Sequence, residues 1–169
     1  MCRPIYLNEQ IVLALLAFVL WRCGSGNSEL EQVYLPAGMP LVVDITGDDY
    51  YWRIRYPGRD GQLYSADDIT KIELLYLPEH TEIRVQLHSE DYIYTFVVPE
   101  LALNQVAIPE LEFSLEFETA AADTFSLRGK QLCGFVHESL QGQIFVESRK
   151  AFANRLERQQ ISATPSVAQ

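Results

Sequence analysis

Hydrophobic and polar residues alternate with a period of two along several short stretches of this chain. The clearest stretch is Leu111–Glu118, where Leu and Phe residues alternate with Glu and Ser residues. Successive side chains of a β-strand point to opposite faces, so this period indicates strands with one buried face. The pattern predicts strands over Leu41–Ile45, Tyr50–Tyr56, Glu82–Leu87, Tyr92–Val98, Leu111–Glu118 and Gln143–Val146.

Turn-forming residues separate these stretches. The segment Pro57–Gly61 reads as a turn or loop, and single prolines at 78, 99 and 109 interrupt the chain further on. Short strands with turn signals at this spacing favour an all-β sandwich or barrel. Because Tyr92–Val98 is apolar on both faces, we expect it to be a central strand.

The C-terminal region is the part of the globular body that has a helical pattern. Ser148 can cap a helix in which Phe152 and Leu156 share one face. We therefore expect three parts: an N-terminal anchor or signal segment over residues 1–27, a β-domain over residues 28–148, and a C-terminal helix with a tail over residues 149–169.

The N-terminal segment contains an unbroken apolar run of eleven residues, Ile11–Trp21. A membrane-spanning helix needs roughly 20 apolar residues, whereas a run of this length suits a secretion signal. The Gly/Ser-rich stretch Cys23–Ser28 follows it. Three interpretations stay open: a short uncleaved anchor helix, a lipid attached to Cys23, or a cleaved export signal. Each places the body outside the cytoplasm and near a membrane.

The body of the chain is strongly acidic. Between Gly24 and Glu147 there are 21 acidic and seven basic residues, which gives a net charge of −14. Binding to nucleic acid needs Lys and Arg for phosphate contacts, so we expect no nucleic-acid partner. The surplus acid either favours a basic protein partner or only keeps the domain soluble.

The sequence contains three cysteines, Cys2, Cys23 and Cys133. Two lie in or beside the N-terminal hydrophobic segment, and no even-numbered framework is visible. We therefore predict no structural disulfide.

Three blocks of the sequence resemble the cytochrome c oxidase subunit II family. The first is YYWRIRYPGRDGQLYSADDI, residues 50–69, which resembles an aromatic run followed by Tyr-Pro-Gly, Asp-Gly and an acidic segment. The second is LPEHTEIRVQLHSEDYIYTFVVPELALNQVAIP, residues 77–109. The third is LRGKQLCGFVHESL, residues 127–140, which is similar to the family's copper-binding loop. The blocks occur in the family's order.

This resemblance implies a cupredoxin fold, a Greek-key β-barrel that carries a binuclear copper centre. In the family, that centre receives electrons from cytochrome c and passes them to haem in subunit I. The resemblance thus implies a bacterial inner-membrane complex, with the globular domain on the periplasmic side. Its partners would be subunit I of a haem–copper oxidase and a cytochrome c or another basic protein.

The ligand positions depart from the family pattern. Cys133 and His137 have the spacing of the second thiolate and the loop histidine. Aligned without gaps, the other family positions hold residues that are not its ligands; an alternative alignment shortens the loop by two residues and loses the same cysteine. The substituted positions are Tyr94 for the upstream His, Gly129 for the first Cys, Gln131 for the Glu that helps hold a magnesium ion, and Leu140 for the Met.

The aromatic run also changes. Tyr50 corresponds to the exposed tryptophan that the family uses for cytochrome c docking, whereas Trp52 is equally well explained as a core residue. Both are candidates for an electron-entry surface.

One thiolate cannot make the two-sulfur bridge of a binuclear copper site. We therefore predict a non-catalytic, structural or assembly subunit without a bound cofactor. The alternative is a mononuclear copper module or electron carrier that uses Cys133 and His137. An enzyme with Cys133 as nucleophile and His137 as base is a third hypothesis, although no orienting group is visible. The sequence leaves open the electron donor, cytochrome c or quinol, and the identity of subunit I.

Overall fold

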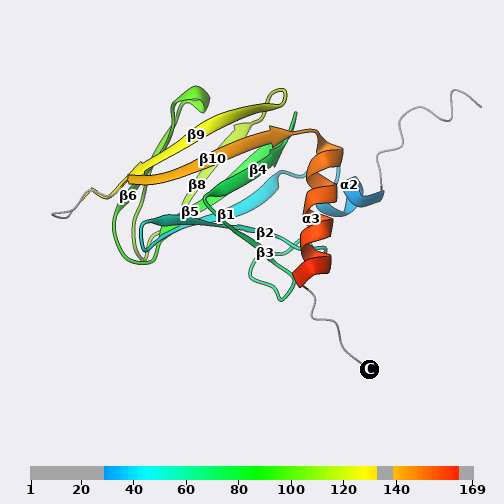
Figure 1. The fold of residues 1–169 in the computed structure, drawn as a ribbon, viewed down its shortest axis with the longest axis horizontal. Coiled ribbons are helices and arrows are strands. Elements are labelled where there is room, and N and C mark those ends of the chain that lie inside the picture. Colours follow the sequence, from blue (N-terminus) through cyan, green and yellow to red (C-terminus); the bar gives the residue numbers. More distant parts are fainter. Residues whose placement is uncertain (1–28, 133–138, 164–169) are drawn as a thin grey trace, which may run out of the picture.

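The computed structural model describes residues 29–132 and 139–163. In these ranges, two five-stranded β-sheets face each other, and two α-helices lie at one end of them (Figure 1). The first sheet has the strand order β3 (Ile69–Ile72), β2 (Tyr51–Tyr56), β1 (Leu41–Asp48), β5 (Glu82–Ser89) and β8 (Phe113–Glu118). The second has the order β4 (Leu74–Pro78), β10 (Ser139–Glu147), β9 (Asp123–Lys130), β6 (Tyr94–Val98) and β7 (Leu103–Ala107).

The prediction of an all-β sandwich or barrel is confirmed. Each of the six stretches with alternating or apolar character contains a strand, within a few residues of the expected bounds. In β2 the alternation matches burial, because Trp52, Ile54 and Tyr56 are fully buried while the residues between them are partly exposed. Tyr92–Val98 also forms an internal strand as predicted, since β6 lies between β7 and β9.

Four strands were not predicted, and their sequences explain why. β4 is a nearly continuous apolar run, Leu-Leu-Tyr-Leu-Pro, which has no period of two. β9 contains Thr, Ser, Arg, Gly and Lys, and it buries mainly Leu127 and Gly129. The short strands β3 and β7 lie at the edges of their sheets, where burial imposes little pattern.

The chain crosses from the first sheet to the second at Glu73. This residue separates β3 from β4 and has a positive φ of 60°. Its N–H donates to the Trp52 carbonyl in the first sheet, and its carbonyl accepts from the Gln143 N–H in the second, both at 2.8 Å. The parallel pairs β1–β5 and β4–β10 then connect distant parts of the sequence, as in a Greek-key barrel.

The helix α3 (Arg149–Ala163) begins as the sequence predicts. The Ser148 hydroxyl accepts a hydrogen bond from the Ala151 N–H at 3.3 Å, and Phe152 and Leu156 are buried on one face. The Phe152 ring packs edge-on against buried Tyr56 of β2. The helix therefore contributes to the core of the β-domain.

Arg155 of α3 contacts two strands of the second sheet. Its guanidinium group lies 3.9 Å from the centroid of the Tyr76 ring and makes two 2.7 Å hydrogen bonds to the Glu147 carboxylate. Tyr76 in turn stacks on Phe145, at a centroid distance of 5.1 Å. A planar guanidinium group suits both contacts at once.

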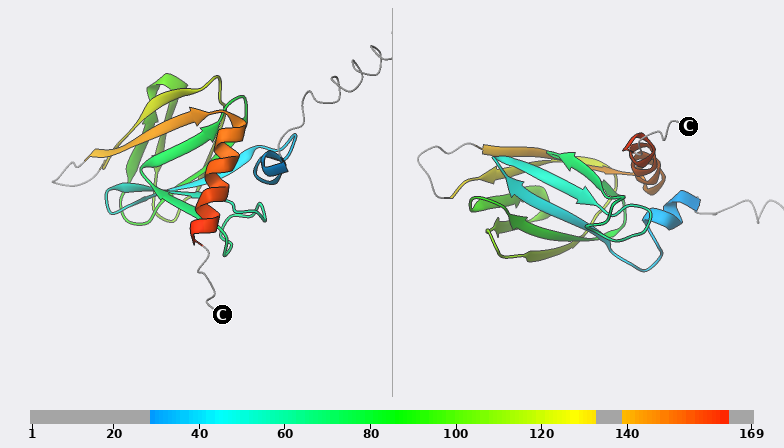
Figure 2. Two further views of the ribbon diagram at one scale, coloured as in Figure 1. Left: turned by 45° about the vertical axis from the view of Figure 1, so that its right-hand side comes forward. Right: turned by 90° about the horizontal axis from the view of Figure 1, so that it is seen from below.

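The short helix α2 (Glu29–Tyr34) lies beside α3 at the same end of the sheets (Figure 2). The Tyr34 hydroxyl oxygen lies 2.9 Å from a Glu157 carboxylate oxygen and 2.8 Å from the Gln160 side-chain oxygen. Arg59 also binds Glu157, and this hydrogen bond lowers the pKa of the Glu157 carboxyl group. The first and the last helix of the described chain are thereby joined.

No helix in the described ranges is long and apolar enough to cross a lipid bilayer. The predicted hydrophobic helix and anchor or signal over residues 1–27, including Cys2 and Cys23, lie outside the described residues. The division into three parts therefore stays a prediction.

Replacing Phe152 with Ala tests whether α3 belongs to the core. Because the Phe152 side chain is fully buried, we expect the free energy of unfolding to fall by about 3–5 kcal/mol. Chemical denaturation of the purified protein measures this change. Lys150→Ala, on the exposed side of the same helix, is the control and should stay within about 0.5 kcal/mol of the wild type. Equal stability of all three proteins would contradict a core role.

Candidate functional site

The resemblance points to the end of the barrel opposite α3, where the hairpin between β1 and β2 meets β6. Asp49 and Tyr50 form a two-residue turn in which both have positive φ, 46° and 67°. Such turns favour Asn and Gly, and a positive φ is rare for a tyrosine. Two side chains accept hydrogen bonds from the turn's backbone: the Asp49 N–H donates to the Asp91 carboxylate at 3.0 Å, and the Tyr50 N–H donates to the Tyr94 hydroxyl oxygen at 3.4 Å.

Tyr94 occupies the position that the resemblance assigns to the upstream histidine ligand. Its side chain is fully buried, and its hydroxyl donates to the Asp91 carboxylate at 2.8 Å. Burial, with a further contribution from this hydrogen bond, raises the pKa of the Tyr94 hydroxyl. The phenol is therefore protonated at neutral pH and directed at a carboxylate.

Trp52 fills the space between the two sheets beside Tyr94. Its indole ring is fully buried, with edge contacts to Tyr94 at 6.0 Å and to Phe96 at 5.5 Å between ring centroids. Two glycines lie beside these rings and leave room for them. A Cβ on Gly47 would clash with the Tyr94 ring, and a Cβ on Gly129 would lie 3.0 Å from the Trp52 ring. Trp52 is thus a core residue.

Gly129 occupies the position of the first cysteine in the gapless alignment. A Cβ there would also lie 2.7 Å from the Thr95 carbonyl oxygen and 3.1 Å from the Leu140 Cβ. Real Cβ atoms do not approach a backbone oxygen this closely, so a larger residue would force β6 and β9 apart.

The other two substituted positions are also in the interior. Leu140 is fully buried and pairs with Gly129 in the β9–β10 ladder. Gln131 is 5% exposed, bridges to Tyr94, and its side-chain oxygen has no hydrogen-bond partner in the described chain. The structure therefore brings Tyr94, Gly129, Gln131 and Leu140 close to one another.

Cys133 and His137 lie outside the described residues. The positions that are described contribute a phenol, a bare backbone, a neutral amide and an aliphatic side chain. Across residues 29–132 and 139–163, no group of three or more His, Cys, Asp or Glu side chains is arranged to hold a metal ion. This donor set does not fit a binuclear copper centre, which needs soft thiolates and imidazoles.

The candidate docking aromatics have separate positions. Tyr50 is partly exposed at the hairpin tip, where its ring stacks on Tyr92 at 5.6 Å, whereas Trp52 is in the core. Tyr92 is 44% exposed. Tyr50 and Tyr92 therefore form an aromatic pair at the surface of this end of the barrel, beside exposed Asp49 and Asp91.

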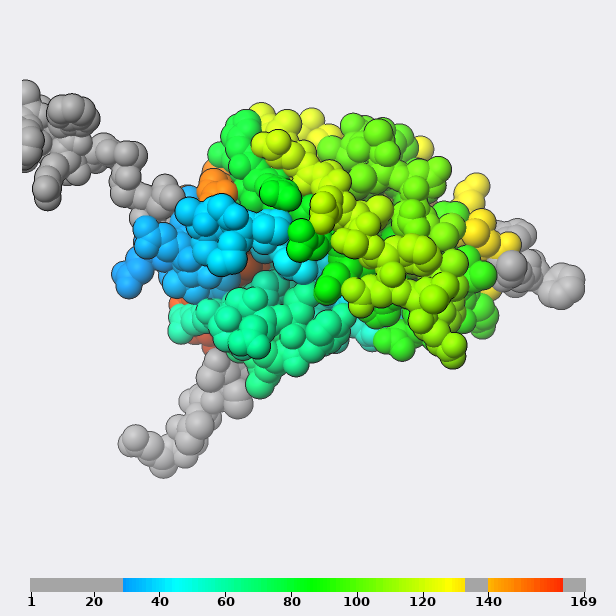
Figure 3. Space-filling view, turned by 180° about the vertical axis from the view of Figure 1, so that it is seen from behind, coloured from blue at the N-terminus to red at the C-terminus, as the bar shows by residue number. Residues whose placement is uncertain are grey.

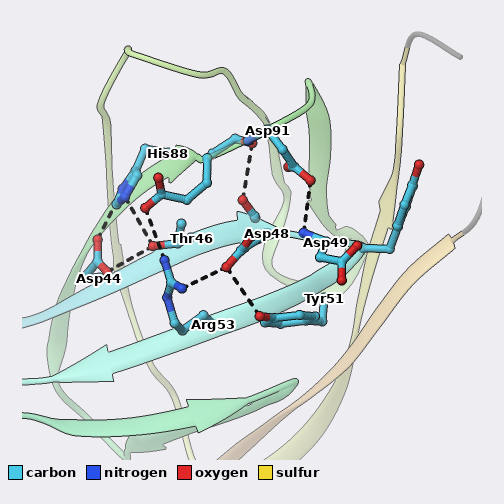
Figure 4. A network of polar contacts seen from close by, with 12 residues as sticks. Asp44, Thr46, Asp48, Asp49, Tyr51, Arg53, His88 and Asp91 are labelled. Carbon is cyan, nitrogen blue, oxygen red and sulfur yellow. Dashed lines mark hydrogen bonds and ion pairs between the residues drawn. The ribbon is translucent and has the colours of Figure 1, made fainter.

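A polar network covers the outer face of the first sheet (Figure 4). Asp44 and Thr46 of β1 are each 1% exposed, and the parallel register places His88 of β5 opposite Thr46. The two His88 ring nitrogens lie 3.2 Å from Asp44 Oδ1 and 3.2 Å from Thr46 Oγ1. Sequence reasoning missed this network because the register of two strands some 40 residues apart is not visible in the sequence.

Two further contacts tie this network to its surroundings. Tyr64, from the loop between β2 and β3, donates its hydroxyl to Asp44 at 2.9 Å. Arg53 binds Asp48 at 2.8 Å and Glu90 at 3.2 Å. In Figure 3 the segment that includes Tyr64 (blue-green) lies next to the segment around β8 (yellow-green) on one face of the molecule. Because Asp44 and Thr46 are buried, we assign this network a structural role.

Comparisons with known proteins agree with the resemblance. The family model described as "Cytochrome C oxidase subunit II, periplasmic domain" matches residues 41–148, which is more than half of the chain. Cytochrome c oxidase subunit 2 of Thermostichus vulcanus is 29% identical over 128 residues, 75% of this chain and 36% of that protein. An alternative cytochrome c oxidase subunit 2 of Bradyrhizobium diazoefficiens is 27% identical, over 72% of this chain and 52% of that protein. The chain spans about a third to a half of the length of these relatives.

Solved structures support the same fold. The periplasmic domain of subunit II of cytochrome oxidase from Bradyrhizobium japonicum superposes with a TM-score of 0.61 at 23% identity, covering 73% of this chain and 96% of that domain. A second structure, of subunit II of cytochrome c oxidase in a mixed disulfide with a thioredoxin-like protein, has a TM-score of 0.61 at 25% identity, covering 72% of this chain and 92% of that one. The family match and the shared fold agree: this chain belongs to the cytochrome c oxidase subunit II family and carries its periplasmic cupredoxin domain.

Proposed function

We propose that this chain is a subunit II-like component of a membrane haem–copper oxidase that serves structure or assembly rather than electron transfer through copper. The domain would lie on the periplasmic side, against subunit I, as a non-catalytic part of the complex. Membership of the subunit II family supports the place in the complex. The packing of Trp52 against Tyr94 and against Gly129 supports the second half of the proposal, a role without electron transfer through copper.

The copper argument depends on space as well as on ligand chemistry. A binuclear centre needs two bridging thiolates, and position 129 has neither a thiol nor room for a Cβ. The Tyr94 hydroxyl is hydrogen-bonded to Asp91, and Leu140 offers no donor atom. Cys133 and His137 alone supply one thiolate and one imidazole, which falls short of the family's ligand set.

The partner chemistry follows from charge. Arg53, Arg55 and Arg84 each pair with a carboxylate in the described chain. Since acidic residues far outnumber basic ones, many carboxylates stay without a cation, and the domain presents a negative surface. A basic protein partner, such as a cytochrome c, would be attracted to this surface most strongly at low ionic strength.

Copper titration of the full-length protein tests the absence of a copper centre. After reconstitution with copper and removal of the free ion, we expect well under one copper per chain and none of the intense thiolate-to-copper absorption. Cys133→Ser should leave the copper content unchanged. Stoichiometric copper that disappears in Cys133→Ser would contradict the proposal and support the alternative of a mononuclear carrier at Cys133 and His137.

Gly129→Cys tests whether position 129 has room for a cysteine side chain. Because the new Cβ meets the Thr95 carbonyl and Trp52, we expect the free energy of unfolding to fall by about 1–3 kcal/mol, with no gain of copper. Ser126→Cys, at an exposed position on the same strand, is the matched control and should change stability by less than about 0.5 kcal/mol. A stable Gly129→Cys protein that binds two coppers would refute the argument from space.

Purification from native membranes tests the place in the complex. An affinity-tagged copy of this chain should bring down a membrane subunit with the absorption spectrum of haem, and an untagged strain processed in parallel gives the background. A haem-free protein that elutes as a monomer from mild detergent would count against the proposal.

A further inference from the structure

Five aromatic side chains form a continuous path from the surface to the core at the hairpin end of the barrel. We call Tyr50, Tyr92, Tyr94, Trp52 and Phe96 the aromatic cluster. Tyr94 contacts both surface tyrosines, at 6.3 Å from Tyr50 and 6.2 Å from Tyr92 between ring centroids, and it contacts Trp52 at 6.0 Å. Rings in edge contact at such distances allow fast electron transfer, so a charge that enters at exposed Tyr92 can reach buried Tyr94.

The Tyr94 hydroxyl has a proton acceptor in place. It donates to Asp91 Oδ1 at 2.8 Å, and the N–H groups of Tyr92 and Asp49 hold the same carboxylate at 2.7 and 3.0 Å. Asp91 itself is exposed, so a proton that it accepts can pass to solvent. A tyrosine whose proton can leave together with its electron is oxidised more easily than one whose proton cannot.

Three other described tyrosines also direct their hydroxyls at carboxylates, and one of them is Tyr51, whose hydroxyl donates to Asp48 outside the aromatic cluster. Tyr34 and Tyr64 also point their hydroxyls at carboxylates, Glu157 and Asp44, but both lie outside the aromatic cluster. Trp52 belongs to the cluster, but its indole N–H is buried without a hydrogen-bond partner in the described chain. An oxidised Trp52 therefore has no acceptor for its indole proton, so we expect the radical to be localised on Tyr94.

We propose that Tyr94 is a redox-active tyrosine, with Asp91 as its proton acceptor and Tyr92 as its contact to the surface. The oxidant is a one-electron oxidant in solution, of the class of organic peroxyl radicals. Tyr94 gives up one electron through Tyr92 to the peroxyl radical, and its phenolic proton passes to Asp91. The peroxyl radical takes that electron and one proton from water to become a hydroperoxide, and Asp91 returns its proton to water.

The reverse step restores the phenol. A small reductant such as a thiol supplies one electron through Tyr92, and Asp91 takes up a proton from water and passes it to the Tyr94 oxygen. The thiol loses its own proton to water and becomes a thiyl radical. Trp52 packs against the Tyr94 ring, and Phe96 packs against Trp52 behind it. Because the Tyr94 side chain is fully buried, its oxidised ring is kept away from water and other radicals. This role requires neither copper nor subunit I, so it stands or fails independently of the proposed function.

Photo-oxidation of the full-length chain in detergent tests the proposal. A ruthenium(III) polypyridyl complex, generated by a light flash with a cobalt(III) quencher, serves as the surface oxidant. Electron paramagnetic resonance should detect a long-lived neutral tyrosyl radical in the wild type. Tyr94→Phe should remove the long-lived signal and leave only short-lived surface radicals, whereas the matched control Tyr64→Phe, which also loses a carboxylate-bound hydroxyl, should keep it.

Two further variants separate the path from the proton acceptor. Asp91→Asn keeps a side-chain oxygen for the two backbone N–H groups but is a far weaker base, so the long-lived radical should form at least about tenfold more slowly. Tyr92→Phe should slow its formation without shortening its lifetime. Circular dichroism of each variant verifies that it is folded. An unchanged radical in folded Tyr94→Phe, or an unchanged rate in Asp91→Asn, would overturn the proposal.

Discussion

The contact of the Trp52 indole with the bare backbone of Gly47 and Gly129 is the interaction on which this domain depends. Gly129 comes from the opposite sheet and Gly47 pairs with Trp52 in the same sheet, so the two sheets can approach around one large ring. Tyr94 and Phe96 then pack on the edges of the indole and complete the interior at this end. Because protein interiors are close-packed, a change at any of these positions affects the others.

Much of the fold could be predicted from the sequence, because burial on one face imposes a period of two on a strand. The stretch Tyr50–Tyr56 is an example, where each apolar residue after the turn is buried in β2. The same reasoning failed for β4 and β9, whose residues lack that period. The crossing between sheets at Glu73 could not be predicted, since a positive φ at a glutamate leaves no signal in composition.

The residues at the family's ligand positions could be named from the sequence, but the way they pack against one another could not. The resemblance gives Tyr94, Gly129, Gln131 and Leu140 as substituted ligand positions, and in the structure they lie near one another. The structure adds the physical reason that these residues occur together: the Tyr94 hydroxyl donates to Asp91, and the Trp52 indole leaves no room for a Cβ at position 129. The contact of His88 with buried Asp44 had no signal in the sequence, because it depends on the register of two distant strands.

The link between α2 and α3 has a consequence for how the chain acquires its structure. Tyr34 binds residues that lie 123 and 126 positions further along the sequence, and β4 pairs in parallel with β10. Contacts this distant in sequence give the domain a high contact order, which slows folding. Since α3 supplies Phe152 and Leu156 to the core, a chain that ends before α3 would leave part of this interior uncovered.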